Sequence, residues 1–250
     1  MIGIIGGMGP KAGLDLYNEI ISITPALDDQ DHIPAVLLSD PTIPSRTNYI
    51  LEGDISPLPK LVAAAKSLQK IGADYIVLGC NAAHLFAHEI QRQVHIPVIN
   101  MLYETSKYVQ TNYSYATKVG LLATTATIKS GLYHKYFEDK QIEVLTPDKT
   151  IQEENVMQSV KNVKMGFIDH PTKKLIEKAF NSLVEKGAEV IILGCTELPL
   201  LLHDKEMKVP AVNATRILAT KAVEYSLSQN CYDDELKVSH KQMLFSGTAI

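Results

Sequence analysis

The sequence contains no tryptophan, only three cysteines, and no apolar run near the roughly 20 residues that a membrane span requires. The cysteines, Cys80, Cys195 and Cys231, are odd in number and widely spaced, which argues against a disulfide framework. None of them has further Cys or His residues at clustered ligand spacing, and Cys80 and His84 alone are too few for zinc. We therefore expect free thiols and no metal.

The sequence also lacks a large excess of charge of either sign. The 24 Lys and Arg residues against 28 Asp and Glu give a net charge of −4, and no basic stripe is present, so nucleic acid is not expected as the main partner. The opening segment from Met1 to Gly7 has no basic leader and too short an apolar run for a signal peptide. The sequence predicts a cytoplasmic protein.

Short apolar runs rich in β-branched residues alternate with helical patterns along the chain. Strands are predicted at Ile2–Ile5, Ala35–Leu38, Tyr75–Leu78, Val98–Ile99, Val119–Leu122, Glu143–Leu145, Val190–Leu193 and Ala211–Val212. Helices are predicted at Leu14–Ile23, Leu58–Ile71, Ile128–Asp139, Ile151–Lys164, Lys173–Lys186 and Thr215–Leu227. Continuous apolar strands separated by helices are typical of parallel sheets that are covered on both faces, so an α/β fold is predicted.

The sequence also repeats itself at an offset of about 115 residues. The segment from Lys70 to Asn81, KIGADYIVLGCN, matches EKGAEVIILGCT from Glu185 to Thr196. Two flanking pairs keep the same order: IGIIG at residue 2 with VGLLA at residue 119, and IPVIN at residue 96 with VPAVN at residue 209. A duplicated half-domain explains this, so we predict two pseudo-symmetric lobes, residues 1–105 with 215–230 and residues 106–214, followed by a peripheral tail over 231–250.

Each repeat places a cysteine after a strand and a single glycine, Cys80 after Gly79 and Cys195 after Gly194. Ligands bind outside the carboxyl ends of parallel strands, so facing lobes would place the two thiols on opposite sides of one cleft. We expect a helix to begin after each cysteine and to lower the thiol pKa. Two opposed, interchangeable acid/base groups suit inversion of a stereocentre: a thiolate removes the α-proton and the opposite thiol donates another. Cys231 has no counterpart in the repeat and is expected to be structural.

Six motifs in order resemble the aspartate racemases of the aspartate/glutamate racemase superfamily, from Met1 to about Ser228. They are GGMGP at residue 6, DPTIPSRT at 40, GCNAAH at 79, VGLLATTAT at 119, KMG at 164 and GCTE at 194. The resemblance implies two α/β lobes with the active site in the cleft between them, no pyridoxal phosphate or metal, and a homodimer. It implies interconversion of L- and D-aspartate, with glutamate as a further substrate, by Cys80 and Cys195.

The same resemblance assigns the substrate site. Arg46 and Lys164 match the two basic positions, which suits a dicarboxylic amino acid because a guanidinium grips a carboxylate in bidentate fashion. Asn81 and Thr196 are expected to bind the α-carboxylate, and Glu197 to accept from the α-ammonium or cap its helix. His84 either orients the site or packs as a hydrogen-bonded core residue. The loop after the strand at 119–122 contains Thr124, Thr125 and Thr127, which are expected to line the cleft. The other predicted substrate-binding residues are Met8, Ala82, Ala83, Thr125 and Thr127.

Other functions stay open at this point. Ala82, Gly13, Ala126 and Asn213 depart from the residues common in the family. Ala82 and the unusual tail leave room for a non-catalytic amino-acid-binding protein on this scaffold. Glutamate racemases typically open with Asp-Ser-Gly and have His where this chain has Glu197. Relatives that act on hydantoins or maleate, or that racemise many amino acids, are further alternatives. Relatives that decarboxylate malonates typically need only one of the two cysteines.

A nucleotide-binding alternative rests on Gly7-Met8-Gly9-Pro10-Lys11-Ala12, which fits the dinucleotide fingerprint after a strand. The acidic residue that the fingerprint requires about 20 residues on would have to be the more distant Asp40. Pro10 suits the first turn of a helix beside any anion equally well. A nicotinamide-dependent oxidoreductase is therefore the weaker hypothesis.

Overall fold

Two four-stranded parallel sheets form the framework of the molecule, which the computed structural model describes over residues 1–138, 141–202 and 207–228. The first sheet has the order β2-β1-β3-β4 and the second has the order β6-β5-β7-β8. Their bounds are β1 Ile2–Gly6, β2 Ala35–Ser39, β3 Tyr75–Leu78, β4 Val98–Ile99, β5 Lys118–Leu122, β6 Glu143–Leu145, β7 Val190–Leu193 and β8 Ala211–Asn213. The predicted α/β fold with two lobes is confirmed.

The strands of the two sequence repeats pair and pack in the same way. β1 pairs with both β2 and β3, and β5 pairs in the same way with β6 and β7. Gly3 in β1 and Gly120 in β5 sit where a Cβ would lie 3.0 Å from Ala73 and 3.2 Å from Ala188, respectively. Leu68 and Leu183, near the ends of the helices that precede Ala73 and Ala188, are equally close, at 3.2 Å and 3.1 Å. Each central strand is therefore crowded at the same place, where glycine leaves room.

Helices cover both faces of the first sheet. Their bounds are α1 Pro10–Ile23, α2 Arg46–Glu52, α3 Leu58–Ile71 and α4 Ala87–Gln91, with 3₁₀ turns η1 Asp29–Asp31 and η2 Ala82–Phe86. One face packs on α3 through fully buried side chains such as Leu61 and Leu68. The other face packs on α1 through Leu16 and Ile20. β1 and β3 are buried throughout, which is why their sequences are continuously apolar.

The second sheet is covered in the same manner. Its helices are α6 Thr125–Lys129, α7 Leu132–Phe137, α8 Lys149–Ile151, α9 Gln158–Lys164 and α10 His170–Glu185, with the π-helical segment η4 Gln152–Met157 and the 3₁₀ turn η5 Leu198–Leu200. Ile176 and Phe180 of α10 pack on one face, and Tyr133 and Phe137 of α7 pack on the other.

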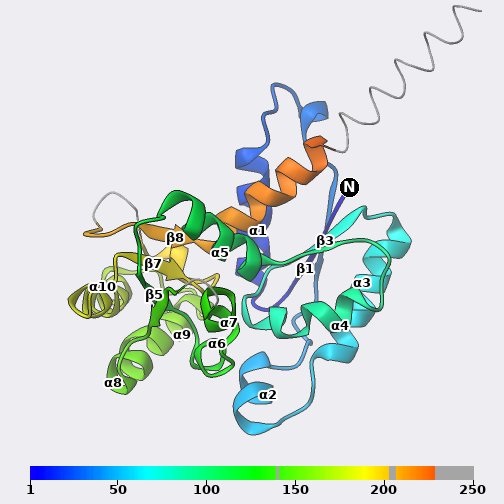
Figure 1. Cartoon of the computed structure of the whole chain (residues 1–250). Coiled ribbons are helices and arrows are strands. Elements are labelled where there is room, and N and C mark those ends of the chain that lie inside the picture. The colour runs from blue at the N-terminus through cyan, green and yellow to red at the C-terminus, as the bar shows by residue number, and fades with distance from the viewer. Residues whose placement is uncertain (139–140, 203–206, 229–250) are drawn as a thin grey trace, which may run out of the picture.

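The last helix of each lobe packs against the sheet of the other lobe. α5 (Met101–Asn112) follows β4 of the first lobe, yet Leu102 and Val109 pack against the second sheet. The helix over residues 214–228 follows β8, yet its core residues Leu218 and Ala222 pack against the first sheet beside α1, as Figure 1 shows. This exchange fixes the lobes against each other.

Several predicted elements differ from those observed. The sequence analysis did not predict α5 or the short α2. The helix expected over 128–139 is divided by Gly131, whose φ of +66° ends α6 before α7 begins. The helix expected over 151–164 includes the π-helical segment. Cys231 and the predicted tail lie outside the described residues.

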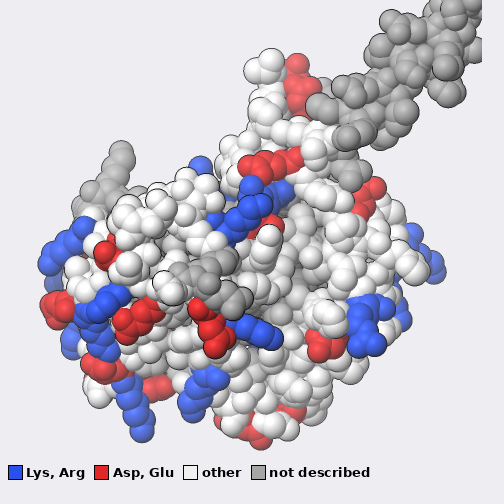
Figure 2. All heavy atoms as spheres, in the orientation of Figure 1, with Lys and Arg blue, Asp and Glu red and all other residues white. Residues whose placement is uncertain are grey.

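No helix within the described part of the chain has the length and apolar character needed to cross a membrane. On the face shown in Figure 2, basic and acidic side chains are intermixed and form no continuous patch of one sign.

Candidate active site

Each sheet has a topological switch point, where the chain reverses direction across the sheet. In the order β2-β1-β3-β4, the chain reverses direction across the sheet between β1 and β3, and the second sheet reverses between β5 and β7. Open parallel sheets bind ligands in the crevice outside the carboxyl ends of such strands. Cys80 follows β3 and Cys195 follows β7, so each thiol lies at a switch point.

Both thiols line one cavity between the lobes, as the repeat predicted. The cavity is small, about 30 Å³. The lining residues are Met8, Arg46, Thr47, Cys80, Asn81, Ala82, Thr124, Thr127, Lys164, Gly194, Cys195, Thr196 and Glu197. They come from both lobes, and both cysteines are buried. A small molecule here is in contact with a thiol from each half of the chain.

Cys195 lies against a buried carboxylate. Its Sγ donates to Oε2 of Glu197 at 3.0 Å, and the Thr196 hydroxyl donates to the same oxygen at 3.2 Å. Burial, the charge of Glu197 and this hydrogen bond together raise the pKa of Cys195 well above its usual value. The expectation that a helix start lowers the pKa of this thiol is wrong: only the short 3₁₀ turn η5 follows it, and the nearest charge is negative. Cys195 is therefore a thiol at neutral pH.

The turn that carries Cys80 is held by an uncharged histidine of the same lobe. His84 is buried, and burial lowers its pKa to about 4, so the imidazole is uncharged at neutral pH. The Met101 amide donates to Nε2 at 3.2 Å, which leaves Nδ1 protonated to donate to the Cys80 carbonyl at 2.9 Å. His84 thus ties the turn after β3 to the start of α5. Both ring nitrogens of His84 form hydrogen bonds with backbone groups, one of which is the Cys80 carbonyl.

The glycines before the cysteines are required for space. Neither Gly79 nor Gly194 has a positive φ, so backbone conformation alone does not require a glycine at either position. A Cβ on Gly194 would lie 2.7 Å from Leu121 Cδ1 and 3.1 Å from the Tyr133 ring. A Cβ on Gly79 would lie 3.3 Å from the Gly13 Cα. Each strand therefore runs close to its neighbours as it reaches the cleft.

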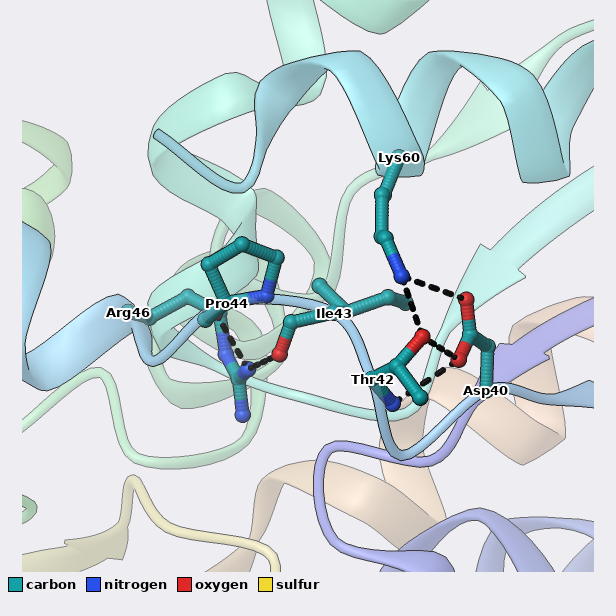
Figure 3. Close-up of polar contacts among 6 residues, drawn as sticks. All are labelled: Asp40, Thr42, Ile43, Pro44, Arg46 and Lys60. Atoms are coloured by element: carbon teal, nitrogen blue, oxygen red, sulfur yellow. Dashed lines mark hydrogen bonds and ion pairs between the residues drawn. The ribbon is translucent and has the colours of Figure 1, made fainter. Parts of the chain in front are cut away.

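Backbone carbonyls hold the guanidinium of Arg46 in place. Nη1 donates to the Pro44 carbonyl at 2.8 Å and to the Ile43 carbonyl at 3.2 Å, as Figure 3 shows. Nη2 donates to the Met8 carbonyl at 3.1 Å. The preceding loop is closed by Asp40, whose carboxylate accepts from Thr42 and pairs with Lys60 at 3.8 Å. Arg46 is a fixed positive charge on the first-lobe side of the cavity.

The second-lobe cation is held more loosely. Nζ of Lys164, at the end of α9, lies 3.8 Å from Oε1 of Glu197, and the lysine side chain is 49% exposed while that of Glu197 is 5% exposed. The pair therefore joins a mobile surface lysine to a buried carboxylate. Lys164 partly compensates the charge that Glu197 places beside Cys195.

Buried polar atoms without a partner mark where a ligand would bind. Nine buried side-chain atoms of the described residues have no hydrogen bond, and three of them belong to residues that line the cavity: Nε of Arg46, Nδ2 of Asn81 and Oε1 of Glu197. Native structures seldom leave such groups unsatisfied. The first two are donors and the third is an acceptor, which is the set that the carboxylate and ammonium of an amino acid require.

The structure places the predicted site residues as follows. Cys80, Cys195, Met8, Arg46, Asn81, Ala82, Thr127, Lys164, Thr196 and Glu197 line the cavity. Ala83 is fully buried beneath it, and the hydroxyl of Thr125 donates to Glu153 at 2.8 Å; neither residue lines the cavity.

The cavity also includes residues that were not predicted. Thr47 and Gly194 line it, together with Thr124, which the sequence analysis expected at the cleft. Thr124 caps α6, and its Thr-x-x-Thr spacing is a signal for that cap. Tyr133 donates to Oδ1 of Asn81 at 2.6 Å across the lobes, a contact that no local pattern reveals.

No group of three or more His, Cys, Asp or Glu side chains in the described ranges is arranged to hold a metal ion.

Comparison with known proteins gives the family. Residues 5–222 match the Asp/Glu/hydantoin racemase family. The chain belongs to that family. A broad-specificity amino-acid racemase of Bacillus subtilis (strain 168) is 28% identical over 232 residues, which cover 91% of this chain and 99% of that protein. The solved aspartate racemase of Picrophilus torridus is 32% identical with a TM-score of 0.77, covering 90% of this chain and 93% of that one.

A glutamate racemase of a Sulfurihydrogenibium species (strain YO3AOP1) is 31% identical over 223 residues, which cover 85% of this chain and 76% of that protein. The predicted resemblance to the aspartate/glutamate racemase superfamily is thereby confirmed. Amino-acid racemases are isomerases that act on small amino acids, and this is the class to which the chain belongs.

Proposed function

We propose that the protein interconverts L- and D-aspartate without pyridoxal phosphate, with Cys80 and Cys195 as opposed acid/base groups. The observation that carries the proposal is that one thiol from each repeat lines the same inter-lobe cavity. Two facing groups of the same kind suit a reaction whose substrate and product are mirror images, because they exchange roles when the direction reverses.

Substrate binding follows from the unpartnered atoms. The α-carboxylate accepts from Nδ2 of Asn81 and from the guanidinium of Arg46, and the α-ammonium donates to Oε1 of Glu197. These contacts place Cα between the two thiols. The hydrogen bonds to the α-carboxylate also stabilise the negative charge that develops there as the α-proton leaves.

The reaction then needs one thiolate and one thiol. The thiolate of Cys80 removes the α-proton. The electron pair of the broken Cα–H bond is delocalised into the α-carboxylate. The thiol of Cys195 donates its proton to the opposite face of Cα and becomes a thiolate. The product has inverted configuration, Cys80 is now protonated, and the reverse reaction starts from this state. The contact between Cys195 and Glu197 favours the protonated form of Cys195 in the free enzyme.

Two cationic side chains at the cavity, Arg46 and Lys164, favour a dicarboxylic amino acid. The aspartate racemase among the relatives supports aspartate, and the glutamate racemase supports glutamate as a further substrate. The relative of broad specificity and Ala82 beside Cys80 favour a second candidate, a racemase acting on several amino acids.

We also propose a cytoplasmic homodimer with the lobe boundaries given by the repeat, residues 1–105 with 215–230 and residues 106–214. Sedimentation equilibrium of the full chain tests the dimer directly. A single species at the mass of one chain would contradict it.

The test of the function is racemisation of L-aspartate followed by circular dichroism, without added cofactor. The wild-type protein should convert L-aspartate to a racemic mixture. Cys80→Ser and Cys195→Ser should each lower the rate by about 10³-fold or more, the scale of a lost acid/base group. Equal activity in either variant would refute the two-thiol mechanism. Tight binding of aspartate without any turnover would identify an amino-acid-binding protein instead.

A further inference from the structure

The cleft continues into a second, much larger cavity that the proposed reaction does not use. This cavity measures about 530 Å³, compared with about 30 Å³ for the cavity between the thiols. The two share Met8, Arg46, Lys164 and Glu197, so they adjoin. An amino acid whose Cα lies between the thiols has this space available for its side chain.

The walls of the second cavity suit a chain of methylene groups. Apolar side chains from the β1–α1 turn, the loop before α2 and helix α9 line it: Met8, Pro10, Pro41, Ile43 and Val163. Each methylene group that moves from water onto such a surface gains about fourfold in affinity.

A cation without a partner stands at this cavity. Lys11, in the first turn of α1, lines it and is exposed. Its Nζ lies 3.6 Å from the position of a Cβ on Gly166, which follows α9 of the second lobe, so the side chain reaches from one lobe toward the other. Within the described ranges, no carboxylate lies at ion-pair distance from Lys11.

The charges of the cavity also favour an anion at its far end. The start of α1 faces the cavity through Gly9 and Pro10 and has no side-chain cap, and a helix N-terminus attracts negative charge. Glu197 is the only carboxylate among the lining residues, it is buried, and its Oε1 has no hydrogen bond. Glu197 fits the ammonium of the substrate, and Lys11 fits a second carboxylate farther out.

We propose that this second cavity is the subsite for the substrate's side chain, and that it selects dicarboxylic amino acids longer than aspartate. The methylene groups lie along the apolar walls, and the distal carboxylate binds between Lys11 and the start of α1. Side chains that end in an ammonium are disfavoured by Lys11, Arg46 and Lys164. This inference rests on the amino-acid site of the proposed function and names its substrate class.

Calorimetry of the full chain with L-aspartate, L-glutamate, L-2-aminoadipate, L-norleucine and L-lysine tests the subsite. Affinity should rise with each methylene group along the dicarboxylic series and should be lower for norleucine and lysine. Lys11→Met should lower the ratio of the 2-aminoadipate to the aspartate affinity about fivefold, the scale of one exposed charge pair. Lys11→Arg should preserve that ratio. Lys70→Met, which removes an exposed charge of the same lobe at the end of α3, should leave it unchanged.

Aspartate as the tightest ligand, lysine binding as tightly as 2-aminoadipate, or an equal loss for all ligands in Lys11→Met would overturn the subsite. Loss of the α-proton of aspartate in deuterium oxide, measured in parallel, reports on the racemase reaction separately. Exchange together with an unchanged affinity ratio refutes the subsite alone. A selective loss in Lys11→Met without exchange refutes the racemase and leaves the subsite standing.

Discussion

Both lobes carry a glycine and a cysteine at the end of equivalent strands, yet the surroundings of the two thiols differ. On the first-lobe side, His84 is buried and neutral, and its imidazole binds the carbonyl of Cys80. On the second-lobe side, the carboxylate of Glu197 accepts directly from the Cys195 thiol. The duplication keeps the positions of the thiols, and the charge of Glu197 raises the pKa of Cys195.

The residues that hold the substrate differ in a similar way. Arg46 is held by the carbonyls of Met8, Ile43 and Pro44, while Lys164 is half exposed and pairs with Glu197. The cavity therefore has one cation that the backbone holds in place and one cation that is open to solvent.

The largest effect that we expect concerns His84 and the stability of the first lobe. The pKa of His84 is lowered to about 4 in the folded protein, so the histidine takes up a proton more readily once the chain unfolds. Its contribution to stability is present above pH 6.5 and is lost as the pH falls through 4, about 3 kcal/mol in all. Urea unfolding at pH 7, 5.5 and 4 should show this loss in the wild type.

The His84→Gln variant separates this effect from the titration of carboxylates. It should lose about 3 kcal/mol less than the wild type between pH 7 and pH 4. The exposed His88→Gln is the matched control and should follow the wild type. Parallel pH profiles for all three proteins would show that His84 is not held neutral.

The second effect compares the two cations. Arg46→Met should lower kcat/KM by about 100-fold, the scale of lost hydrogen bonds from a fixed charged group. Lys164→Met should lower it by about fivefold, because an exposed charge is screened. The exposed Arg92→Met is the control. An equal or larger loss in Lys164→Met would mean that the mobile cation, not the fixed one, binds the carboxylate in the transition state.

A smaller effect is expected at the Cys195 thiol. Because Glu197 raises the pKa of Cys195, Glu197→Gln should lower that pKa and increase the alkylation rate of Cys195 at pH 8 severalfold. Peptide mapping by mass spectrometry after iodoacetamide treatment measures the rate for each cysteine. Glu185→Gln, an exposed carboxylate of the same lobe, should change nothing. An unchanged Cys195 rate in Glu197→Gln would remove the proposed asymmetry.

The smallest effect tests how the lobes are joined. Tyr133→Phe removes the hydroxyl that donates to Asn81 and leaves Oδ1 of Asn81 buried without that bond, which should cost about 1 kcal/mol of unfolding free energy. Tyr115→Phe, at an exposed position, should cost nothing measurable. Urea unfolding of both variants provides the comparison, and equal stabilities would show that this contact does not couple the lobes.

Much of this comparison could be predicted from local sequence. The strands β3, β4, β6 and β7 begin and end where the apolar runs do, because buried parallel strands need continuous apolar sequence. The repeat predicted that both cysteines reach one site. α5 escaped prediction because its buried face includes Thr105 and Ser106, so the helix shows no clear apolar stripe.

The chemistry of the site depended on contacts that only the fold creates. The order Gly-Cys-Thr-Glu does not show that Glu197 turns back to accept from the Cys195 thiol two residues earlier. The bond between Tyr133 and Asn81 joins residues 52 positions apart. The expected lowering of the thiol pKa failed at Cys195 for the same reason: burial and a neighbouring carboxylate outweigh a short helical turn.

The most direct test of the two-thiol account is proton NMR of L-aspartate in deuterium oxide, read early in the reaction. Two opposed thiols take a proton on one face and deliver a solvent-derived deuteron on the other. The account predicts that D-aspartate forms with deuterium at Cα while the remaining L-aspartate keeps its α-proton. Deuterium entering the recovered L-aspartate as fast as D-aspartate appears, or protium carried into the product, would contradict it and indicate a single acid/base group.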